Sequence, residues 1–156
     1  MLNPQKDKYV IMELIPTRSD PKYGIIAQIS ALKLNGIKLE DRFDYRVEDK
    51  FVDNEYVLGM IQYDKEMFTY VNNIYFMFEK FKHWVKDYPI YIVEEDYTLK
   101  YLKDLKNKKE LVFNYLDLKN GPDVITRLKE KYKLQPSFHI VDLIYEAIIY
   151  EGNNKK

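Results

Sequence analysis

The 156-residue sequence predicts a single α/β domain with a mixed five-stranded sheet and helices on both of its faces. Apolar and polar residues alternate through the first third of the chain, which is typical of half-buried strands. Apolar residues then recur at spacings of three and four, which is typical of amphipathic helices packed on a sheet. Three hairpin strands, followed by strands that alternate with helices, predict a sheet that is first antiparallel and then parallel. We expect the core to span residues 8–151 and the polar end of the chain, Glu151–Lys156, to be frayed.

The first three predicted strands follow one another without an intervening helix. The segment Tyr9–Ile15 is rich in Val, Ile and Leu, and it ends at Pro16, which has no N–H to donate to a neighbouring strand. Residues 25–34 and 37–46 alternate in polarity on either side of Asn35-Gly36. Asn-Gly is a strong signal for a two-residue hairpin turn in which both residues have a positive φ. The three strands are therefore expected to be antiparallel neighbours.

After residue 65 the sequence predicts helices and short strands in turn. The helical spacing is clearest from Met67 through Val71, Ile74 and Phe78 to Phe81. In chain order the predicted elements are a helix over Glu66–Val85, a strand at Ile90–Val93, a helix over Asp96–Leu105, a strand at Leu111–Phe113, a helix that opens at Pro122 and a last helix after Ser137. Connections of this kind are right-handed crossovers between parallel strands.

Charge and composition restrict the kinds of partner and compartment. Lys plus Arg and Asp plus Glu number 25 each, so that the formal net charge is zero. This balance counts against strong nonspecific binding to nucleic acid, although a local basic face remains compatible with it. The chain has no cysteine, which excludes disulfides and thiolate metal sites and suits a reducing cytoplasm. No apolar run approaches the length that spans a membrane, so a cytoplasmic protein without a membrane partner is expected.

Aromatic residues are abundant, with 15 Tyr, 8 Phe and one Trp. Most are expected to pack in the fold, because Tyr suits half-buried positions where the ring is covered and the hydroxyl is wet. A stacking surface for bases is the alternative. Tyr75 and Phe76 lie outside the apolar stripe of their predicted helix and mark a candidate partner surface. The lysine-rich stretch from Lys100 to Lys109 is either solvated surface or a track for a phosphate backbone.

Three stretches of the sequence resemble, in their order and spacing, those of one enzyme family. They are YVIMELIPTRSDP, which begins at Tyr9, GIIAQISALKLNGIKLEDRFDYRV, which begins at Gly24, and RLKEKYKLQPSFHIVDLIYEAIIYE, which begins at Arg127. Together with the predicted strand order they resemble the DnaQ-like (DEDDh) 3′–5′ exonucleases, the group that includes polymerase proofreading domains. The resemblance covers residues 8–151 and implies a three-layer ribonuclease H-like fold.

The resemblance also assigns five positions to the family's active site. It places Glu13 at the first metal-binding Asp and Ile15 at the Glu of the first motif. Thr98 falls at the Asp of the second motif, Asp142 at the final Asp and Ser137 at the general-base His. One of the four metal carboxylates is therefore kept, one is lengthened by a methylene, two are lost, and the base is absent. The five residues form a degenerate version of the family's site.

The loss of carboxylates predicts that the chain does not hydrolyse nucleic acid. The family's reaction resembles two-metal phosphodiester hydrolysis, in which divalent ions about 3.5–4 Å apart hold the attacking and leaving oxygens. Mg²⁺ requires hard oxygen ligands; isoleucine offers none, and threonine offers only a neutral hydroxyl. Glu13 and Asp142 suffice for a weak single ion at most, so no cofactor is expected. In the alternative, a shifted register brings Glu95 or Asp96 into the site and rebuilds a Mg²⁺ or Mn²⁺ site.

We therefore expect a non-catalytic, exonuclease-like binding module, that is, a pseudoenzyme. Its partner would be a single-stranded nucleic acid or a protein of replication or repair, held near Pro16 and Thr17 beside the former metal positions. The loss of acidic ligands lowers the repulsion between this cleft and a phosphate backbone. The alternative is an active metal-dependent 3′–5′ exonuclease that uses Glu13, Asp96 and Asp142, and a third hypothesis is a subunit whose surface serves assembly only.

Overall fold

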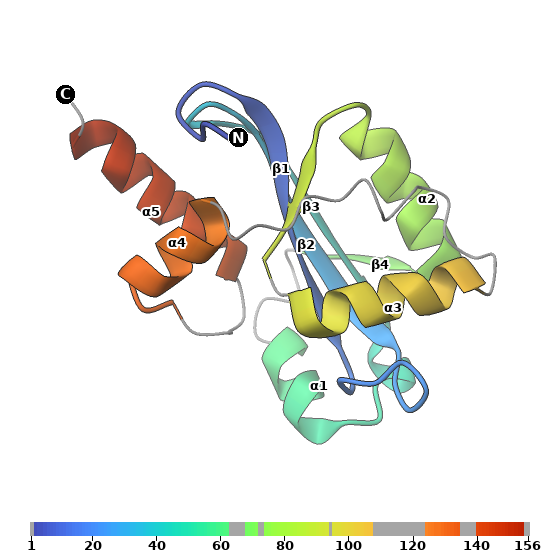
Figure 1. Cartoon of the computed structure of the whole chain (residues 1–156). Coiled ribbons are helices and arrows are strands. Elements are labelled where there is room, and N and C mark those ends of the chain that lie inside the picture. The colour runs from blue at the N-terminus through green and yellow to red at the C-terminus, as the bar shows by residue number, and fades with distance from the viewer. Residues whose placement is uncertain are drawn as a thin grey trace.

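The computed structural model describes residues 2–62, 68–71, 74–93, 95–107, 124–134 and 140–154, and a five-stranded mixed sheet lies at its centre (Figure 1). β1, β2 and β3 are antiparallel, whereas β5 runs parallel to β1 and β4 runs parallel to β3. The prediction of an α/β fold with a mixed five-stranded sheet is confirmed. The strands are β1 (Lys8–Pro16), β2 (Ile26–Asn35), β3 (Lys38–Val47), β4 (Thr69–Val71) and β5 (Ile90–Ile92), in the spatial order β4-β3-β2-β1-β5.

The predicted hairpin joins β2 to β3, but its turn is shifted by one residue. Asn35 belongs to β2 and pairs with Lys38, so the two turn residues are Gly36 and Ile37. Gly36 has a φ of 59°, and neither Asn35 nor Ile37 has a positive φ. A positive φ at the first turn residue alone is the pattern of a type II′ turn, which favours glycine at that position. A Cβ at Gly36 would also lie 2.7 Å from the backbone oxygen of Gln5.

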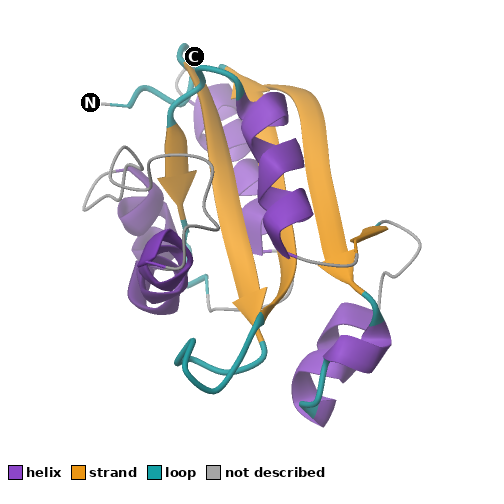
Figure 2. Cartoon of the chain, turned by 90° about the vertical axis from the view of Figure 1, so that its right-hand side faces the viewer, coloured by secondary structure: helices purple, strands orange, loops and turns teal. Residues whose placement is uncertain are grey.

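Helices lie on both faces of the sheet and at one end of it. α2 and α3 cover one face, α4 and α5 cover the other, and α1 lies at the end where β1 and β3 finish (Figures 1 and 2). Within the described ranges, no helix has the length and apolar character required to cross a bilayer. The helices are η1 (Asp49–Phe51, 3-10), α1 (Glu55–Gln62), α2 (Ile74–Val85), α3 (Glu95–Asn107), α4 (Val124–Lys131) and α5 (Ile140–Asn154).

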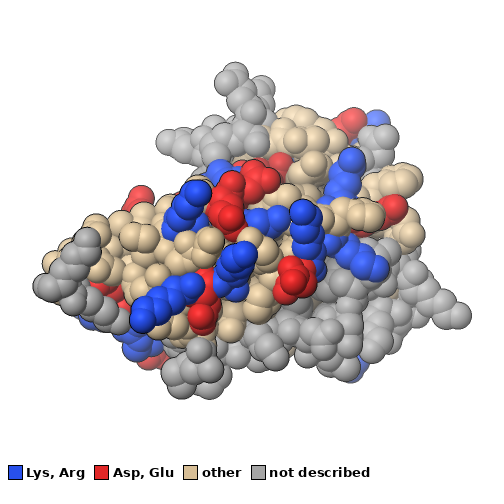
Figure 3. All heavy atoms as spheres, turned by 90° about the horizontal axis from the view of Figure 1, so that it is seen from above, with Lys and Arg blue, Asp and Glu red and all other residues tan. Residues whose placement is uncertain are grey.

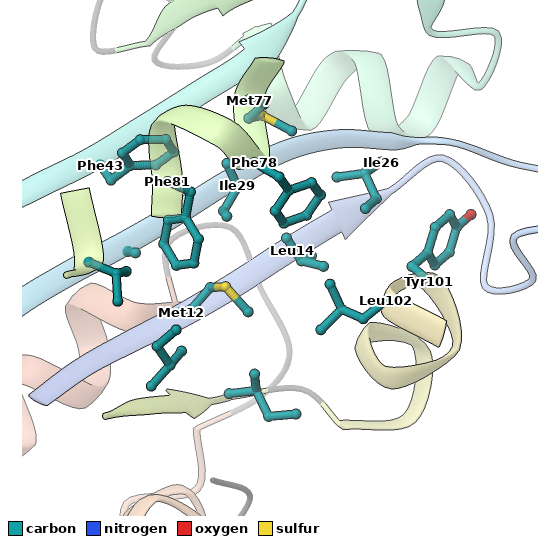
Figure 4. Close-up of a cluster of buried hydrophobic side chains, with 14 of the residues drawn as sticks. Met12, Leu14, Ile26, Ile29, Phe43, Met77, Phe78, Phe81, Tyr101 and Leu102 are labelled. Atoms are coloured by element: carbon teal, nitrogen blue, oxygen red, sulfur yellow. The ribbon is translucent and has the colours of Figure 1, made fainter. Parts of the chain in front are cut away.

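The first core cluster fills the space between the sheet and helices α2 and α3. Val10, Met12 and Leu14 alternate toward this face of β1 and are almost completely buried. Each side chain buried in this way contributes about 1.5–3 kcal/mol to stability. The side chains that meet them from β2, β3 and the two helices include Ile26, Ile29, Phe43, Met77, Phe78, Phe81, Tyr101 and Leu102 (Figure 4).

The second core cluster lies on the opposite face, under α4 and α5. Tyr9 and Ile11 of β1 point to this side, and Leu32 and Leu34 of β2 lie beside them. The segment before β1 closes the cluster at one end, because Gln5 Nε2 donates to the carbonyl of Ile148 at 3.2 Å. The helical side chains of the cluster are Leu128 of α4 and Ile140, Val141, Ile144, Ala147 and Ile148 of α5.

The short edge strand β4 was not predicted. The expected helix over Glu66–Val85 is split, because Thr69–Val71 pairs with the end of β3 and the helix begins only at Ile74. β4 is therefore the fifth strand of the described sheet. The predicted strand at Leu111–Phe113 lies outside the described residues.

The end of the chain is helical where a frayed tail was expected, since α5 continues to Asn154 and Glu151 is buried. Arg127 Nη2 donates to Glu151 Oε1 at 2.8 Å, and Lys131 Nζ donates to Oε2 at 2.7 Å. The hydrogen bonds from Arg127 and then from Lys131 lower the pKa of Glu151 to about 2, against the opposing effect of burial. This ion cluster fastens α4 to the last turns of α5.

Candidate functional site

Polar side chains form a row across three strands, on the sheet face that α5 covers. Glu13 of β1 pairs with Ser30 of β2, and Ser30 pairs with Asp44 of β3. By strand alternation these side chains point to the same face as Ile11 and away from Met12. Glu13 and Ser30 are buried, and the side chain of Asp44 is 7% exposed. Because burying polar groups is costly unless they are paired, this polar row (Glu13, Ser30 and Asp44) is the candidate functional site.

Arg42 connects the polar row to α5. Its Nε donates to Asp44 Oδ2 at 3.0 Å, its Nη1 to Asp142 Oδ1 at 2.5 Å and its Nη2 to Asp142 Oδ2 at 3.2 Å. The bond to Asp142 raises the pKa of Arg42, and the bond to Asp44 adds to this effect, although burial opposes it. Asp142 lies in the first turn of α5, where the helix dipole also favours an acid. One guanidinium therefore bridges two carboxylates from different elements.

Gln28 and Arg46 extend the polar surface toward the end of the sheet. They are cross-strand neighbours and both are fully buried. The Arg46 guanidinium donates to Asp49 and lies 5.0 Å from the centre of the Tyr70 ring. The amide of Gln28 and the hydroxyl of Ser30, in contrast, make no hydrogen bond within the part of the chain that the structure describes. An unmet buried group costs about 1–3 kcal/mol, so these side chains offer donors and acceptors that the fold does not use.

The residues at the end of β1 are built into the fold. Ile15 is buried in the apolar cluster beneath α1, and Pro16 is half-buried. Thr17 is 2% exposed; its hydroxyl accepts from Ile25 N at 2.9 Å and its carbonyl accepts from Asn54 Nδ2 at 2.7 Å. These contacts close the loop after β1. The predicted role of Pro16 and Thr17 in nucleic-acid binding stays a prediction.

Thr98 lies on a helix that packs on the opposite face of the sheet from the polar row. It is buried on α3 one turn before Leu102, which packs against Met12 and Leu14 (Figure 4). Glu13 alternates to the other face of β1. The assignment of Thr98 to the site therefore stays a prediction.

The other predicted site positions are only partly described. Glu13 and Asp142 share a face, as the resemblance implies. Ser137 lies outside the described residues, and so do the side chains of Glu95 and Asp96. The rearranged metal site that would use Asp96 therefore stays a hypothesis.

Sequence reasoning missed the arginine partner of Asp142. Arg42 and Asp142 are 100 residues apart in the chain, so local spacing does not connect them. The signal was nevertheless present in β3, where Arg42 and Asp44 alternate with Phe43 and Tyr45. Because helices were expected on both faces of the sheet, the side of this strand that carries Arg42 and Asp44 had to be covered. Buried charges need partners, so a carboxylate from a covering helix could have been expected beside Arg42.

The site residues that the structure describes do not by themselves fit the metal pair that the resemblance implies. Among the residues that the structure describes, no three His, Cys, Asp or Glu side chains are grouped so that they could hold a metal ion. A cation at Asp142 would meet the fixed charge of Arg42, which lies within hydrogen-bond distance of both carboxylate oxygens. Ile15 supplies no ligand. The arrangement is suited to charge pairing and polar contacts.

The sequence matches no protein-family model. It matches no curated protein either.

Proposed function

We propose that this chain is a non-catalytic binding module built on the ribonuclease H-like sheet of the DnaQ-like exonucleases. The observation that carries the proposal is the position of Arg42, which bonds Asp44 at 3.0 Å and Asp142 at 2.5 and 3.2 Å. At a carboxylate that the resemblance assigns to a metal ion, the chain supplies its own cation. A guanidinium stays protonated, and it uses the carboxylate lone pairs that Mg²⁺ would need.

The order of the strands supports the ribonuclease H-like part of the proposal. Three antiparallel strands are followed by β5, which lies beside β1 and runs parallel to it. A parallel neighbour requires a crossover over one face of the sheet, and α2 packs on the face of Val10 and Met12 between β3 and β5 in the chain. The edge strand β4 is an addition to this order.

The distribution of charge favours a protein partner over a nonspecific grip on nucleic acid. On the face seen from above, Lys and Arg side chains are interspersed with Asp and Glu (Figure 3). Arg18, Arg42 and Arg127 are each paired with a carboxylate. Strong binding to phosphate needs several cations that are free to contact it. A partner surface of mixed charge fits this pattern better than a nucleic-acid backbone.

The test of catalysis is a metal titration combined with a nuclease assay. Calorimetric titration of the purified chain with Mn²⁺ is expected to give no binding at micromolar concentration. Labelled single-stranded DNA and RNA are expected to keep their length in the presence of Mn²⁺. Activity that survives in Glu13→Ala belongs to a contaminating nuclease. Manganese-dependent shortening that is lost in Glu13→Ala, Asp142→Asn and Asp96→Asn would overturn the proposal and favour the enzyme with a rebuilt metal site.

The class of partner is tested separately by gel shift. If the chain changes the mobility of neither DNA nor RNA at low ionic strength, the result agrees with the proposal of a protein partner. A shift that weakens steeply as salt is added indicates phosphate contacts and contradicts this part of the proposal.

A further inference from the structure

Exposed aromatic side chains are concentrated at one end of the molecule. Seven of the ten large apolar side chains that are exposed in the described residues belong to this end. They come from the loop after β1, from η1 and α1, from β4 and from the first turn of α2; the loop and α1 lie at the lower end of Figure 2, and β4 lies above α1. We call this set the aromatic end: Tyr23, Ile25, Phe51, Tyr56, Tyr70, Tyr75 and Phe76.

Polar contacts join four segments of the aromatic end, namely the loop after β1, η1, α1 and β4, and α2 contacts β4. Arg18 in the loop after β1 bonds Asp53 before α1 at 2.7 Å, and Asn54 Nδ2 donates to the carbonyl of Thr17 at 2.7 Å. Arg46 contacts both Asp49 of η1 and the ring of Tyr70 on β4. The loop, η1, α1 and β4 are therefore neighbours in space as well as parts of one end of the sheet.

The exposed area of the aromatic end is close to what one partner contributes to a stable interface. Its six rings are 41–78% exposed. Since an aromatic side chain buries about 150–250 Å² when it is fully covered, these rings alone present roughly 600 Å². A typical monomer has no larger apolar patch than about 300–600 Å². A standard interface buries about 800 Å² on each partner and is rich in Tyr and Phe at its centre.

The chemistry of the surface suits a second copy of the same chain. The loop after β1 carries Asp20 and Lys22, and Lys50 of η1 pairs with Glu48 at 3.4 Å, so this end carries charges of both signs, as a surface that faces its own copy across a twofold axis requires. The chain has a formal net charge of zero, and two copies therefore do not repel each other at long range. β4 is the last strand of the described sheet and is paired there on one side only. A twofold axis at that edge would place the two copies of β4 antiparallel, which lets both edges pair at once.

We propose that the aromatic end is the interface of a twofold homodimer, with Phe51, Tyr56 and Tyr70 near its centre. This inference does not depend on the polar row or on the proposed function. It gives one common explanation for the exposed rings and for the side of β4 that has no neighbouring strand in the described sheet.

The association is tested first by sedimentation velocity on the full chain across the micromolar range. The wild type is expected to shift from monomer to dimer with rising concentration. The double variant Phe51→Ser/Tyr56→Ser is expected to weaken the dimer by about tenfold or more, as loss of central aromatic contacts does. Tyr150→Ser is the matched control, because Tyr150 is also exposed, at 59%, but lies on α5. A wild type that stays monomeric at high micromolar concentration overturns the proposal.

Cross-linking provides a second readout that does not depend on the stability of the double variant. The chain has no cysteine, so a single introduced thiol reports its own proximity to the same position in another copy. Tyr70→Cys is expected to give a covalent dimer with a short bis-maleimide linker at micromolar concentration, and Tyr150→Cys is expected to stay monomeric. Efficient cross-linking through position 150 but not through position 70 would overturn the proposed interface.

Discussion

Replacing Arg42 with methionine is expected to loosen the junction between β3 and the first turn of α5. Methionine keeps much of the side-chain length but removes the charge and every donor. Asp44 and Asp142 would then lose the guanidinium that bonds them at 3.0 Å and at 2.5 and 3.2 Å. Their carboxylates would face each other across an apolar side chain. The expected result is a lower free energy of unfolding.

The magnitude follows from how far the three side chains are buried. They are 27% (Arg42), 7% (Asp44) and 32% (Asp142) exposed, so the cluster is intermediate between a surface pair and a buried one. A surface pair contributes at most about 1 kcal/mol. Breaking a buried pair by removing one partner costs about 3–5 kcal/mol, mainly because the other charge is left uncompensated. We expect Arg42→Met to lose about 2–3 kcal/mol, with most of the loss at Asp44.

Urea unfolding followed by circular dichroism measures this loss. The matched control is Arg18→Met, because the Arg18–Asp53 pair has a similar distance of 2.7 Å but exposed fractions of 40% and 74%. The control is expected to lose less than about 1 kcal/mol. The double variant Arg42→Met/Asp142→Asn is expected to lose less unfolding free energy than the sum of the losses of the two single variants. The reason is that Asp142→Asn removes the carboxylate charge that Arg42→Met leaves without a partner. An Arg42→Met variant as stable as Arg18→Met would refute the reasoning.

Three further predictions concern other parts of the fold. The pKa of Glu151 lies at about 2 in the folded chain and at 4.5 ordinarily, so its stabilising contribution is complete above about pH 4.5 and is lost as the pH falls toward 2. Because its partners are half exposed, Glu151→Gln is expected to lose only about 1–2 kcal/mol of unfolding free energy at pH 7. In urea unfolding, the variant's free energy of unfolding is also expected to depend less on pH between about 4.5 and 2 than that of the wild type. Gln28→Leu removes an unmet buried amide and is expected to raise the unfolding free energy by about 1 kcal/mol; a loss would show that the amide has a partner. Gly36→Ala is expected to lower the free energy of unfolding by about 1 kcal/mol or more because of the positive φ, whereas Gly59→Ala on α1, where a Cβ meets no atom within 4 Å, is expected to be neutral or stabilising in the same urea measurement.

Local signals predicted most of the sheet correctly. Alternation in residues 25–34 and 37–46 located β2 and β3, and the glycine of Asn35-Gly36 located the hairpin between them. The one-residue error in the turn arose because Asn-Gly suits a type I′ turn, whereas the register closes the ladder at Asn35 and Lys38. A turn motif indicates where the chain reverses, and the pairing of the strands decides which residues occupy the turn.

The errors of the prediction lie where distant residues decide the local structure. Thr69–Val71 is three residues long, too short to show an alternating pattern, and it is a strand because the end of β3 offers an edge to pair with. Glu151 looked like the start of a polar tail because its partners Arg127 and Lys131 are 24 and 20 residues away in the chain. Only a folded arrangement turns such a polar residue into a buried one.

The candidate site was predicted in part for the same reason. The strand alternation and the resemblance together place Glu13 and Asp142 on one face, where the structure has them. The bridging arginine, and the buried amide of Gln28, follow from strand register and helix packing. Thr98 was aligned on a motif and is buried on α3, and its assignment to the site stays a prediction.

The contact between the first and last parts of the chain has a consequence during synthesis. Gln5 bonds Ile148 across 143 residues, and the helix that carries Ile148 covers Tyr9 and Ile11. At about 5–20 residues per second, β1 leaves the ribosome roughly 7–29 s before its cover does. For that interval one side of the nascent sheet presents bare aliphatic and aromatic groups to the cell. Chaperones that hold unfinished chains would therefore be needed most just before residues 140–154 emerge.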